Sequence, residues 1–361
     1  MLTDIFLPEN LYLPVLVFLA AFLFAVFSFP IFIKLLERNQ IIDQQAKHKI
    51  HQRRTPSIGG VPIFVAVLLA LLLFTPQQGL SDLKYLIAAI FILFFVGLRD
   101  DLTPLNAYLK LGTQITPALI VYFFFDVSLN SFYTLSPLGP FPSTLALLIS
   151  IFTIIIITNS FNLIDGLDGL AGLLGLISLL SFSIYYLYVG NENFLLVLIA
   201  ICGATAAFLI YNWSPAKIFM GDTGALFIGF IMACSCILFI NHNSSAEVPT
   251  FRASIGTAMA FIAVPLFDTF RIIVYRIKRG QSPFQADQNH LHHFLLRLGL
   301  GHGKVAVILG ALQLFIILLA FAAKNQSDLF LFGLLAIVLF SFNFLISLLI
   351  RRKSQAKKTG I

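Results

Sequence analysis

A succession of long apolar segments limits what this chain can fold into more than any other feature. Runs of about 17–25 apolar residues are long enough to cross a lipid bilayer as helices. The chain is 59% hydrophobic and 11% charged, whereas soluble domains carry about 25% charged residues. The sequence therefore predicts an all-α polytopic membrane protein and excludes a soluble fold. We predict about eleven transmembrane helices, at residues 11–36, 58–75, 83–98, 107–125, 143–159, 169–189, 194–212, 223–240, 254–276, 304–323 and 328–350.

The Lys and Arg residues predict the orientation of these helices, because such residues accumulate in cytoplasmic loops. When the N-terminus is placed outside, only Lys84, Arg252 and Lys324 of the 23 Lys and Arg residues remain outside. We therefore expect an outside N-terminus, a cytoplasmic C-terminus and a basic cytoplasmic tail at residues 351–361. The same loops explain the net charge of +7, so nucleic acid is not an expected partner. Residues 1–361 are expected to form a single integral-membrane domain.

Polar motifs gather in the loops that this topology places on the cytoplasmic side. Carboxylates beside a hydrocarbon core are costly, so a protein that collects them on one face is expected to use them. We therefore place a candidate active site on that face. The motifs are Arg54-Thr55-Pro56 with Gly59-Gly60, Asp100-Asp101, residues 159–168 (NSFNLIDGLD), Gly221-Asp222-Thr223-Gly224 and His290-Leu291-His292-His293.

The segment NSFNLIDGLD is the most specific of these motifs. Asp165 and Asp168 are three residues apart, which places both on one face if a helix starts here. Gly166 and Gly169 allow a phosphate to come close to the backbone. The positive end of the following helix favours an anion or a metal-bound diphosphate. The alternative is a helix cap followed by a glycine turn, which accounts for one Asp but not for two.

The other acidic motifs leave two interpretations open. Adjacent carboxylates such as Asp100 and Asp101 are kept where a cation or a shared proton balances them. A hard ion such as Mg²⁺ takes a few carboxylates and completes its shell with substrate phosphate oxygens. The alternative for this pair is a solvated acidic turn beside Arg99. Asp222 could likewise coordinate a metal at a helix N-terminus or serve only as an N-cap.

The histidine motif and the basic residues suggest contacts with phosphate. The three imidazoles of residues 290–293 could bind zinc, contact phosphate or transfer protons, and the nearby residues 276–279, which include two Arg and one Lys, favour phosphate contact. Arg53 and Arg54 could grip nucleotide phosphates or only anchor their loop. Lys110 is expected to face the carboxylate cluster.

Asp268 and Arg271, three residues apart, could pair with each other or contact substrate.

Taken together and in order, these motifs resemble those of the polyprenyl-phosphate N-acetylhexosamine-1-phosphate transferases. The resemblance covers about residues 41–301 and is closest to the WecA/TagO branch of the MraY-like superfamily, of glycosyltransferase 4 type. MraY enzymes have three consecutive histidines, and Leu291 interrupts that run here. This difference argues against a MurNAc-pentapeptide donor and favours a UDP-N-acetylhexosamine, most often UDP-GlcNAc.

The resemblance implies a reaction as well as a fold. The enzyme would transfer GlcNAc-1-phosphate from the UDP-sugar to undecaprenyl phosphate and release UMP, at the cytoplasmic face of the inner membrane. This would be the first membrane step of a cell-envelope polysaccharide, such as O-antigen. The resemblance implies Mg²⁺ as cofactor, with Mn²⁺ as a substitute, and it allows a homodimer.

The resemblance also implies roles for individual residues. Asp222 matches the metal position, and Asn162 is expected to share that site. The residues expected to be catalytic are Asp100, Asp101, Asp165, His290, His292 and His293. The residues expected to bind the nucleotide are Asn212, Phe219, Gly166, Leu167, Asp168, Arg53, Arg54 and Lys110.

A function of another class is a membrane transporter or flippase for an anionic solute. Transport sites lie near the middle of the bilayer, at broken helices. The acidic motifs of this chain instead lie at predicted helix ends on one side, which favours the transferase.

Overall fold

The computed structural model describes residues 11–39, 55–135, 139–247, 249–282 and 289–359. These ranges are helical and contain no strand. The helices are α1 Tyr12–Arg38, α2 Gly60–Phe74, α3 Gln77–Leu102, α4 Ala107–Thr113, α5 Ile115–Phe124, the short 3-10 helix η2 Tyr133–Leu135, α6 Ser143–Ile164, α7 Leu170–Val189, α8 Glu192–Asn212, α9 Gly221–Ser245, α10 Ser254–Phe261, α11 Ala263–Lys278, α12 Leu291–Arg297, α13 His302–Ala322 and α14 Asp328–Thr359.

The predicted class, an all-α polytopic membrane protein, is confirmed. Eight of the described helices are long and apolar enough to cross a membrane, namely α1, α3, α6, α7, α8, α9, α13 and α14. The pair α10 and α11 makes a ninth span if the two are counted together. Of the remaining predicted segments, α2 has only 15 residues, and residues 107–125 are divided into α4 and α5. The count of eleven and the orientation therefore stay predictions.

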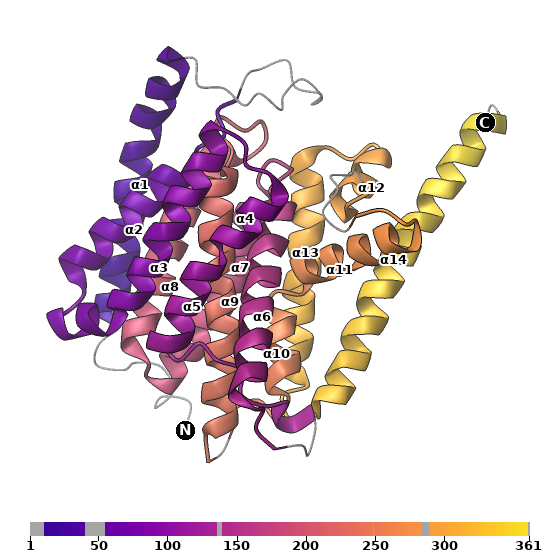
Figure 1. Cartoon of the computed structure of the whole chain (residues 1–361). Coiled ribbons are helices and arrows are strands. Elements are labelled where there is room, and N and C mark those ends of the chain that lie inside the picture. Colours follow the sequence, from indigo (N-terminus) through magenta and orange to yellow (C-terminus); the bar gives the residue numbers. More distant parts are fainter. Residues whose placement is uncertain (1–10, 40–54, 136–138, 248, 283–288, 360–361) are drawn as a thin grey trace.

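Helix α9 forms the centre of the bundle. It is buried along nearly its whole length and packs against α2, α3, α6, α7 and α10. Helices α1 and α14 lie at opposite edges of the bundle (Figure 1). Such an arrangement follows from composition, because a helix that is apolar on every side is stable either inside a bundle or against lipid.

Small residues let α2 and α3 approach the first turn of α9. A Cβ atom at Gly60 would lie 2.1 Å from the backbone nitrogen of Gly224, and one at Gly97 would lie 2.5 Å from Cα of Thr223. Close backbone approach through glycine is a common way for membrane helices to pack. These contacts fix the start of α9 against the end of α3, where the acidic motifs lie.

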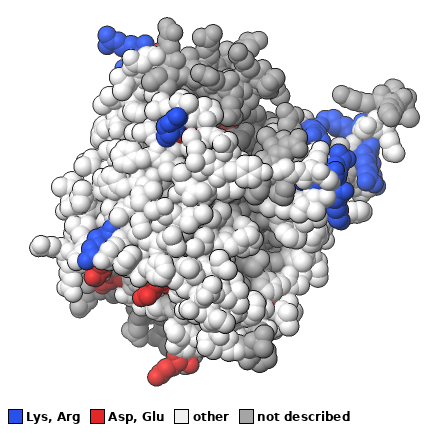
Figure 2. Space-filling view, viewed as in Figure 1, with Lys and Arg blue, Asp and Glu red and all other residues white. Residues whose placement is uncertain are grey.

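The two ends of the bundle differ in charge. In Figure 2, Lys and Arg side chains gather at the upper end and at the tip of α14, and most acidic side chains visible on this face lie at the lower end. Helix α1 begins at the lower end and α14 ends at the upper end (Figure 1). An odd number of membrane crossings would produce this arrangement.

The helix pair α10 and α11 is sharply bent. The two helices meet at an angle of 89° beside Ile262. In Figure 1, α11 leaves the bundle sideways toward α14, below the short helix α12. Because of this bend, the second half of the predicted segment 254–276 does not run in the same direction as its first half.

Candidate active site

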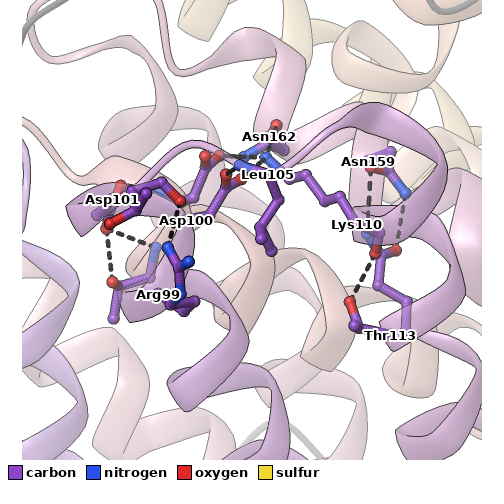
Figure 3. A network of polar contacts seen from close by, with 12 residues as sticks. Arg99, Asp100, Asp101, Leu105, Lys110, Thr113, Asn159 and Asn162 are labelled. Atoms are coloured by element: carbon purple, nitrogen blue, oxygen red, sulfur yellow. Dashed lines mark hydrogen bonds and ion pairs between the residues drawn. The ribbon is translucent and has the colours of Figure 1, made fainter.

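Four separate elements bring polar side chains to one point at the upper end of the bundle. Lys110 of α4 places its Nζ 2.9 Å from Oδ2 of Asp100 at the end of α3. The same Nζ lies 2.6 Å from Oδ1 of Asp222 at the start of α9 and 3.3 Å from Oδ1 of Asn162 at the end of α6. The Asn162 amide also donates to Asp222. Figure 3 shows the Lys110 side chain extending toward Asp100 and Asn162.

This cluster confirms that Lys110 faces the carboxylates, as the sequence predicts. Burial opposes the charge of the Lys110 ammonium, but the carboxylates of Asp222 and Asp100 outweigh this effect and raise the pKa of Lys110. The lysine therefore stays protonated, and it stabilises the two acids at close range.

Asp101 holds the first turn of α9. Its Oδ1 accepts a hydrogen bond from the backbone N–H of Asp222 at 2.8 Å, and its Oδ2 accepts from the N–H of Thr223 at 2.9 Å. An N-terminal turn has free N–H groups, and here a carboxylate from another helix satisfies them. The chain reaches this position through Gly221, whose φ of 72° lies in the left-handed region. Asp101 thus fixes the position of Asp222.

Asp165 and Asp168 also contact backbone groups of the neighbouring loop. Oδ2 of Asp165 accepts from the N–H of Gly221 at 3.0 Å. Asp168 is buried; its Oδ2 accepts from the N–H of Ala216 at 3.3 Å, and its Oδ1 lies 3.2 Å from Nδ1 of His302. The two carboxylates therefore join the end of α6 to the loop before α9.

Asn212, at the end of α8, also forms a hydrogen bond with the loop before α9. Its side chain accepts from the N–H of Gly169 at 2.8 Å and donates to the carbonyl of Ile218 at 2.8 Å. Leu167 is also buried, with 3% of its surface exposed. These contacts shape the wall beside the cluster, and direct binding of uridine by Asn212 and Leu167 stays a prediction.

The Thr55-Pro56 and Gly59-Gly60 part of the first motif is joined to this wall through its backbone. The N–H of Phe219 donates to the carbonyl of Pro56, and the N–H of Gly59 donates to the carbonyl of Phe219, each at 2.8 Å. Two motifs that lie far apart in sequence are therefore side by side. Arg54, which begins this motif, and the preceding Arg53 lie outside the described residues.

Asp268 organises the histidine motif. Its Oδ2 lies 2.8 Å from Nδ1 of His290, and its Oδ1 accepts from the N–H of Leu291 at 2.9 Å. Arg271 donates to the same Oδ1 at 2.9 Å and to the carbonyl of Asn289. The local Asp268–Arg271 pair is thus present, and it anchors the start of α12.

His292 is nearly fully buried beside the NSFNLIDGLD motif. A Cβ atom at Gly166 would lie 3.2 Å from its Nε2, so the glycine leaves room for the ring. Burial, followed by the charge of His293, lowers the pKa of His292 to about 3. His293 packs against it with ring centroids 4.3 Å apart. The motif therefore presents a neutral imidazole to Gly166.

Some participants were missed by motif analysis. Thr223, which receives Asp101, and His302, which contacts Asp168, were not predicted as site residues. Gln114 exchanges hydrogen bonds with Asn159, of which the stronger is 2.8 Å long. His302 could have been noticed as a polar residue at the start of an apolar segment. Thr223 belongs to the Gly221-Asp222-Thr223-Gly224 motif, but its contact with Asp101 depends on the packing of α3 against α9.

Comparison with known proteins finds relatives over most of the chain. The sequence model of glycosyl transferase family 4 matches residues 83–240. A probable undecaprenyl-phosphate N-acetylglucosaminyl 1-phosphate transferase of Bacillus subtilis (strain 168) is 30% identical over 84% of this chain and 83% of its own length. The chain belongs to glycosyl transferase family 4.

Further relatives of this glycosyl transferase family 4 member cover similar lengths. An undecaprenyl-phosphate alpha-N-acetylglucosaminyl 1-phosphate transferase of Pasteurella multocida is 33% identical over 79% of this chain and 78% of its own. A decaprenyl-phosphate N-acetylglucosaminephosphotransferase of Mycobacterium leprae is 29% identical over 81% of this chain and 78% of its own. The matched family segment contains Asp100, Lys110, Asn162 and Asp222, and the histidine helix α12 lies beyond it.

Proposed function

We propose that this protein transfers GlcNAc-1-phosphate from UDP-GlcNAc to undecaprenyl phosphate and releases UMP. The reaction takes place at the cytoplasmic face of the inner membrane and depends on Mg²⁺. The observation that carries the proposal is the convergence of Asp100, Asn162 and Asp222 on the single ammonium of Lys110. Relatives named as polyprenyl-phosphate GlcNAc-1-phosphate transferases support the substrate classes.

The chemistry is a phosphoryl transfer between two anions. An oxygen of the lipid phosphate attacks the β-phosphorus of UDP-GlcNAc, which carries the sugar. The bond from that phosphorus to the oxygen bridging the two phosphates breaks, and UMP leaves with the bonding electrons. Catalysis of such a step consists mainly of positioning and of stabilising negative charge.

The residues of the cluster fit a bound Mg²⁺. Oxygens of Asp222, Asp100 and Asn162 approach one point, where a positive charge is already held. Within the described residues, no three His, Cys, Asp or Glu side chains are grouped so as to hold a metal ion by themselves. The Asp222 carboxylate and the Asn162 amide would leave most coordination positions for water and phosphate oxygens, as Mg²⁺ prefers. When bound, the ion offsets the charge of the two phosphates and of the departing UMP.

The chain's own residues divide the remaining work. Asp222 and Asn162 would hold the metal, Asp100 orients the lipid phosphate, and Lys110 contributes a positive charge to the diphosphate. Asp101 keeps Asp222 in position through the first turn of α9. The His292 ring is uncharged at neutral pH. Its N–H therefore donates a hydrogen bond to phosphate as a neutral imidazole.

An apolar groove offers a place for the polyprenyl chain. Two cavities of about 440 and 390 Å³ lie between α6, α10, α11 and α14 and share several lining residues. The shared residues are Ile156, Met259, Leu266 and Phe332. Helix α11 lines the groove and also carries Asp268, which anchors the histidine motif. A lipid chain in this groove would therefore have its phosphate on the same side as the cluster.

The first experiment is an assay of purified protein in detergent with Mg²⁺, undecaprenyl phosphate and a panel of UDP-sugars. We expect UMP only when UDP-GlcNAc and lipid phosphate are both present, together with a lipid-linked GlcNAc diphosphate. Removing the metal with a chelator should stop UMP release, and added Mg²⁺, or Mn²⁺ in its place, should restore it. UMP without lipid phosphate would indicate a hydrolase, and folded protein inactive with every donor would contradict the proposal.

The groove is tested separately. Ala336→Trp places a large ring among the residues of α14 that line it. We expect this change to lower kcat/KM for undecaprenyl phosphate much more than for a short isoprenyl phosphate, while the KM for UDP-GlcNAc stays the same. Equal effects on both acceptors would place the lipid chain elsewhere.

A further inference from the structure

The bend between α10 and α11 exposes backbone groups that a straight helix would pair. In an α-helix the N–H of Val264 would donate to the carbonyl of Ala260, and residue 265 would donate to the carbonyl of Phe261. The bend separates the first pair, and Pro265 has no N–H for the second. Backbone groups left unpaired inside a membrane protein are strongly destabilising, because no water is there to bind them.

A single side chain from α13 satisfies these groups. Gln313 is fully buried, with 0% of its surface exposed. Its Oε1 accepts from the N–H of Val264 at 2.9 Å, and its Nε2 donates to the carbonyls of Ala260 and Phe261, each at 2.9 Å. The Gln313 amide thus supplies an acceptor for the N–H of Val264 and donors for the carbonyls of Ala260 and Phe261.

The direction of α11 matters for two parts of the proposed site. Its residues Leu266, Phe267 and Phe270 line the apolar groove. On the same helix, Asp268 holds His290 and the first N–H of α12. Helix α11 starts at the bend, so a change of angle there displaces both the groove wall and the anchor of the histidine motif.

We infer that Gln313 is a positioning residue, which fixes the angle between α10 and α11 and thereby sets both the polyprenyl groove and the histidine motif. The inference rests on the proposed role of the groove in binding the lipid chain. Gln313 acts through the backbone of the bend and does not contact the substrates. Packing alone would not require an amide at this position, because burying a polar side chain is costly unless its hydrogen bonds are made.

The test replaces Gln313 with a residue of similar length that makes none of the three hydrogen bonds. In Gln313→Met we expect the ratio of kcat/KM for undecaprenyl phosphate to kcat/KM for a short isoprenyl phosphate to fall by about tenfold, which corresponds to the loss of one or two net hydrogen bonds. The KM for UDP-GlcNAc should change less than about twofold. Gln313→Glu retains the acceptor for Val264 and, when protonated, one donor, so its ratio should be intermediate.

Leu309→Met is the matched control. Leu309 is a fully buried residue one turn earlier on α13, and the exchange conserves volume without affecting the bend. This variant should keep the wild-type ratio. If Gln313→Met cannot be recovered folded, the ratio in Gln313→Glu decides: a decrease supports the inference and a wild-type value overturns it.

The outcomes separate this inference from the proposal on which it rests. A decreased ratio in Ala336→Trp with an unchanged ratio in folded Gln313→Met would overturn the role of Gln313 alone. Unchanged ratios in both variants would overturn the groove and, with it, the inference. A parallel loss for both acceptors and for the donor would show that Gln313 only stabilises the fold, which also contradicts the inference.

Discussion

At the scale of single residues, the centre of this site is an ammonium group in contact with three oxygens from three other helices. Lys110 contacts both Asp100 and Asp222, so each acid has a charged partner although both lie beside the membrane. Two carboxylates in such proximity would otherwise repel each other. The arrangement suits a substrate whose phosphates bind together with a metal ion, because Asp100 and Asp222 have oxygens enough to contact both the metal and Lys110.

Asp222→Asn is expected to abolish transfer while leaving the protein folded. The amide conserves shape but removes the charge that attracts a metal, and losses of at least about 100-fold in kcat are usual for groups that stabilise transferred charge. UMP release by purified protein measures the effect. Asp82→Asn is the matched control, because Asp82 is an exposed acid that contacts Asn193 at the other end of α3. Retained turnover in Asp222→Asn would remove Asp222 from the metal site.

His292 gives an expected dependence of stability on pH. Its pKa is about 3 in the folded protein and about 6.5 in an unfolded chain. Between these two pH values the unfolded chain binds one proton more than the folded protein does. The folded protein therefore has its full stability above about pH 6.5 and loses stability as the pH falls toward 3. One group of this kind contributes about 1 kcal/mol of destabilisation between pH 6.5 and 5.5.

The measurement compares thermal unfolding in detergent at pH 7.5 and pH 5.5. His292→Gln should show a smaller decrease in Tm than the wild type, because glutamine does not titrate. The control is His242→Gln, which changes an exposed histidine at the far end of α9. An equal decrease in Tm for wild type and His292→Gln would contradict the assigned pKa.

At the scale of helices, the site depends on how closely α3 lies against α9. Gly97→Ala would bring a methyl group within 2.5 Å of Cα of Thr223 and 2.8 Å of the carbonyl of Asp222. Either helix must shift, and a displacement of about 1 Å between reacting groups can cost about 100-fold in rate. We expect a large loss of kcat in this variant, with a smaller loss of thermal stability.

The matched control for this substitution is Gly112→Ala. Gly112 lies in α4, and a Cβ atom there would have no neighbour within 4 Å. That variant should retain both stability and activity. Wild-type kcat in Gly97→Ala would mean that α3 and α9 adjust without disturbing Asp100 and Asp222.

Helix α14 supports the histidine helix through one lysine. Nζ of Lys353 donates to the carbonyl of Leu298 at 2.7 Å and lies 3.4 Å from that of Arg297, at the end of α12. A cation at a helix C-terminus satisfies free carbonyls and interacts with the helix dipole. Lys353→Ala should therefore reduce kcat/KM by roughly two- to fivefold. The neighbouring exposed Arg352 provides the control Arg352→Ala, and equal effects of the two would indicate only a general loss of positive charge.

The sequence predicted the helices better than their breaks. Apolar runs locate spanning segments through composition, and every predicted segment contains helix in the structure. The bend at Ile262 was missed because residues 258–267 around it are apolar, although Pro265 was a local signal. The division at Gln114 was also missed. Gln313, which makes the hydrogen bonds to the backbone of the bend, lies about 50 positions further along the chain. Its contacts depend on packing that no local pattern specifies.

For the site, the motifs predicted a common face, and the structure brings Asp100, Lys110, Asn162 and Asp222 together there. The motifs could not predict which acids contact the ammonium group of Lys110 and which accept hydrogen bonds from backbone N–H groups. Asp101 is adjacent to Asp100 in sequence, yet it caps α9 instead of contacting Lys110. Neighbouring residues of a helix point in different directions, so the roles of such a pair depend on how α3 and α9 are oriented against each other.

At the scale of the whole molecule, charge and shape favour one orientation in the membrane. Helix α1 begins at the end of the bundle opposite to that where α14 finishes, and the site lies at the end rich in Lys and Arg (Figures 1 and 2). Positively charged loops remain in the cytoplasm. The proposed donor, a nucleotide sugar, is a cytoplasmic compound, and the orientation that satisfies the charge rule also places the site where this donor occurs.

Cysteine labelling in intact cells tests this orientation. The three native cysteines, Cys202, Cys234 and Cys236, are free and buried, so they provide little background. Ser354→Cys places a thiol on the exposed end of α14, which the charge rule predicts to be cytoplasmic, and Ser81→Cys places one on the exposed start of α3 at the other end. A thiol reagent that does not cross the membrane should label Ser81→Cys in intact cells and Ser354→Cys only after the membrane is opened. The reverse pattern would place Asp222 and the whole cluster outside the cell, where a UDP-sugar could not reach it, and would therefore overturn the proposed reaction together with the topology.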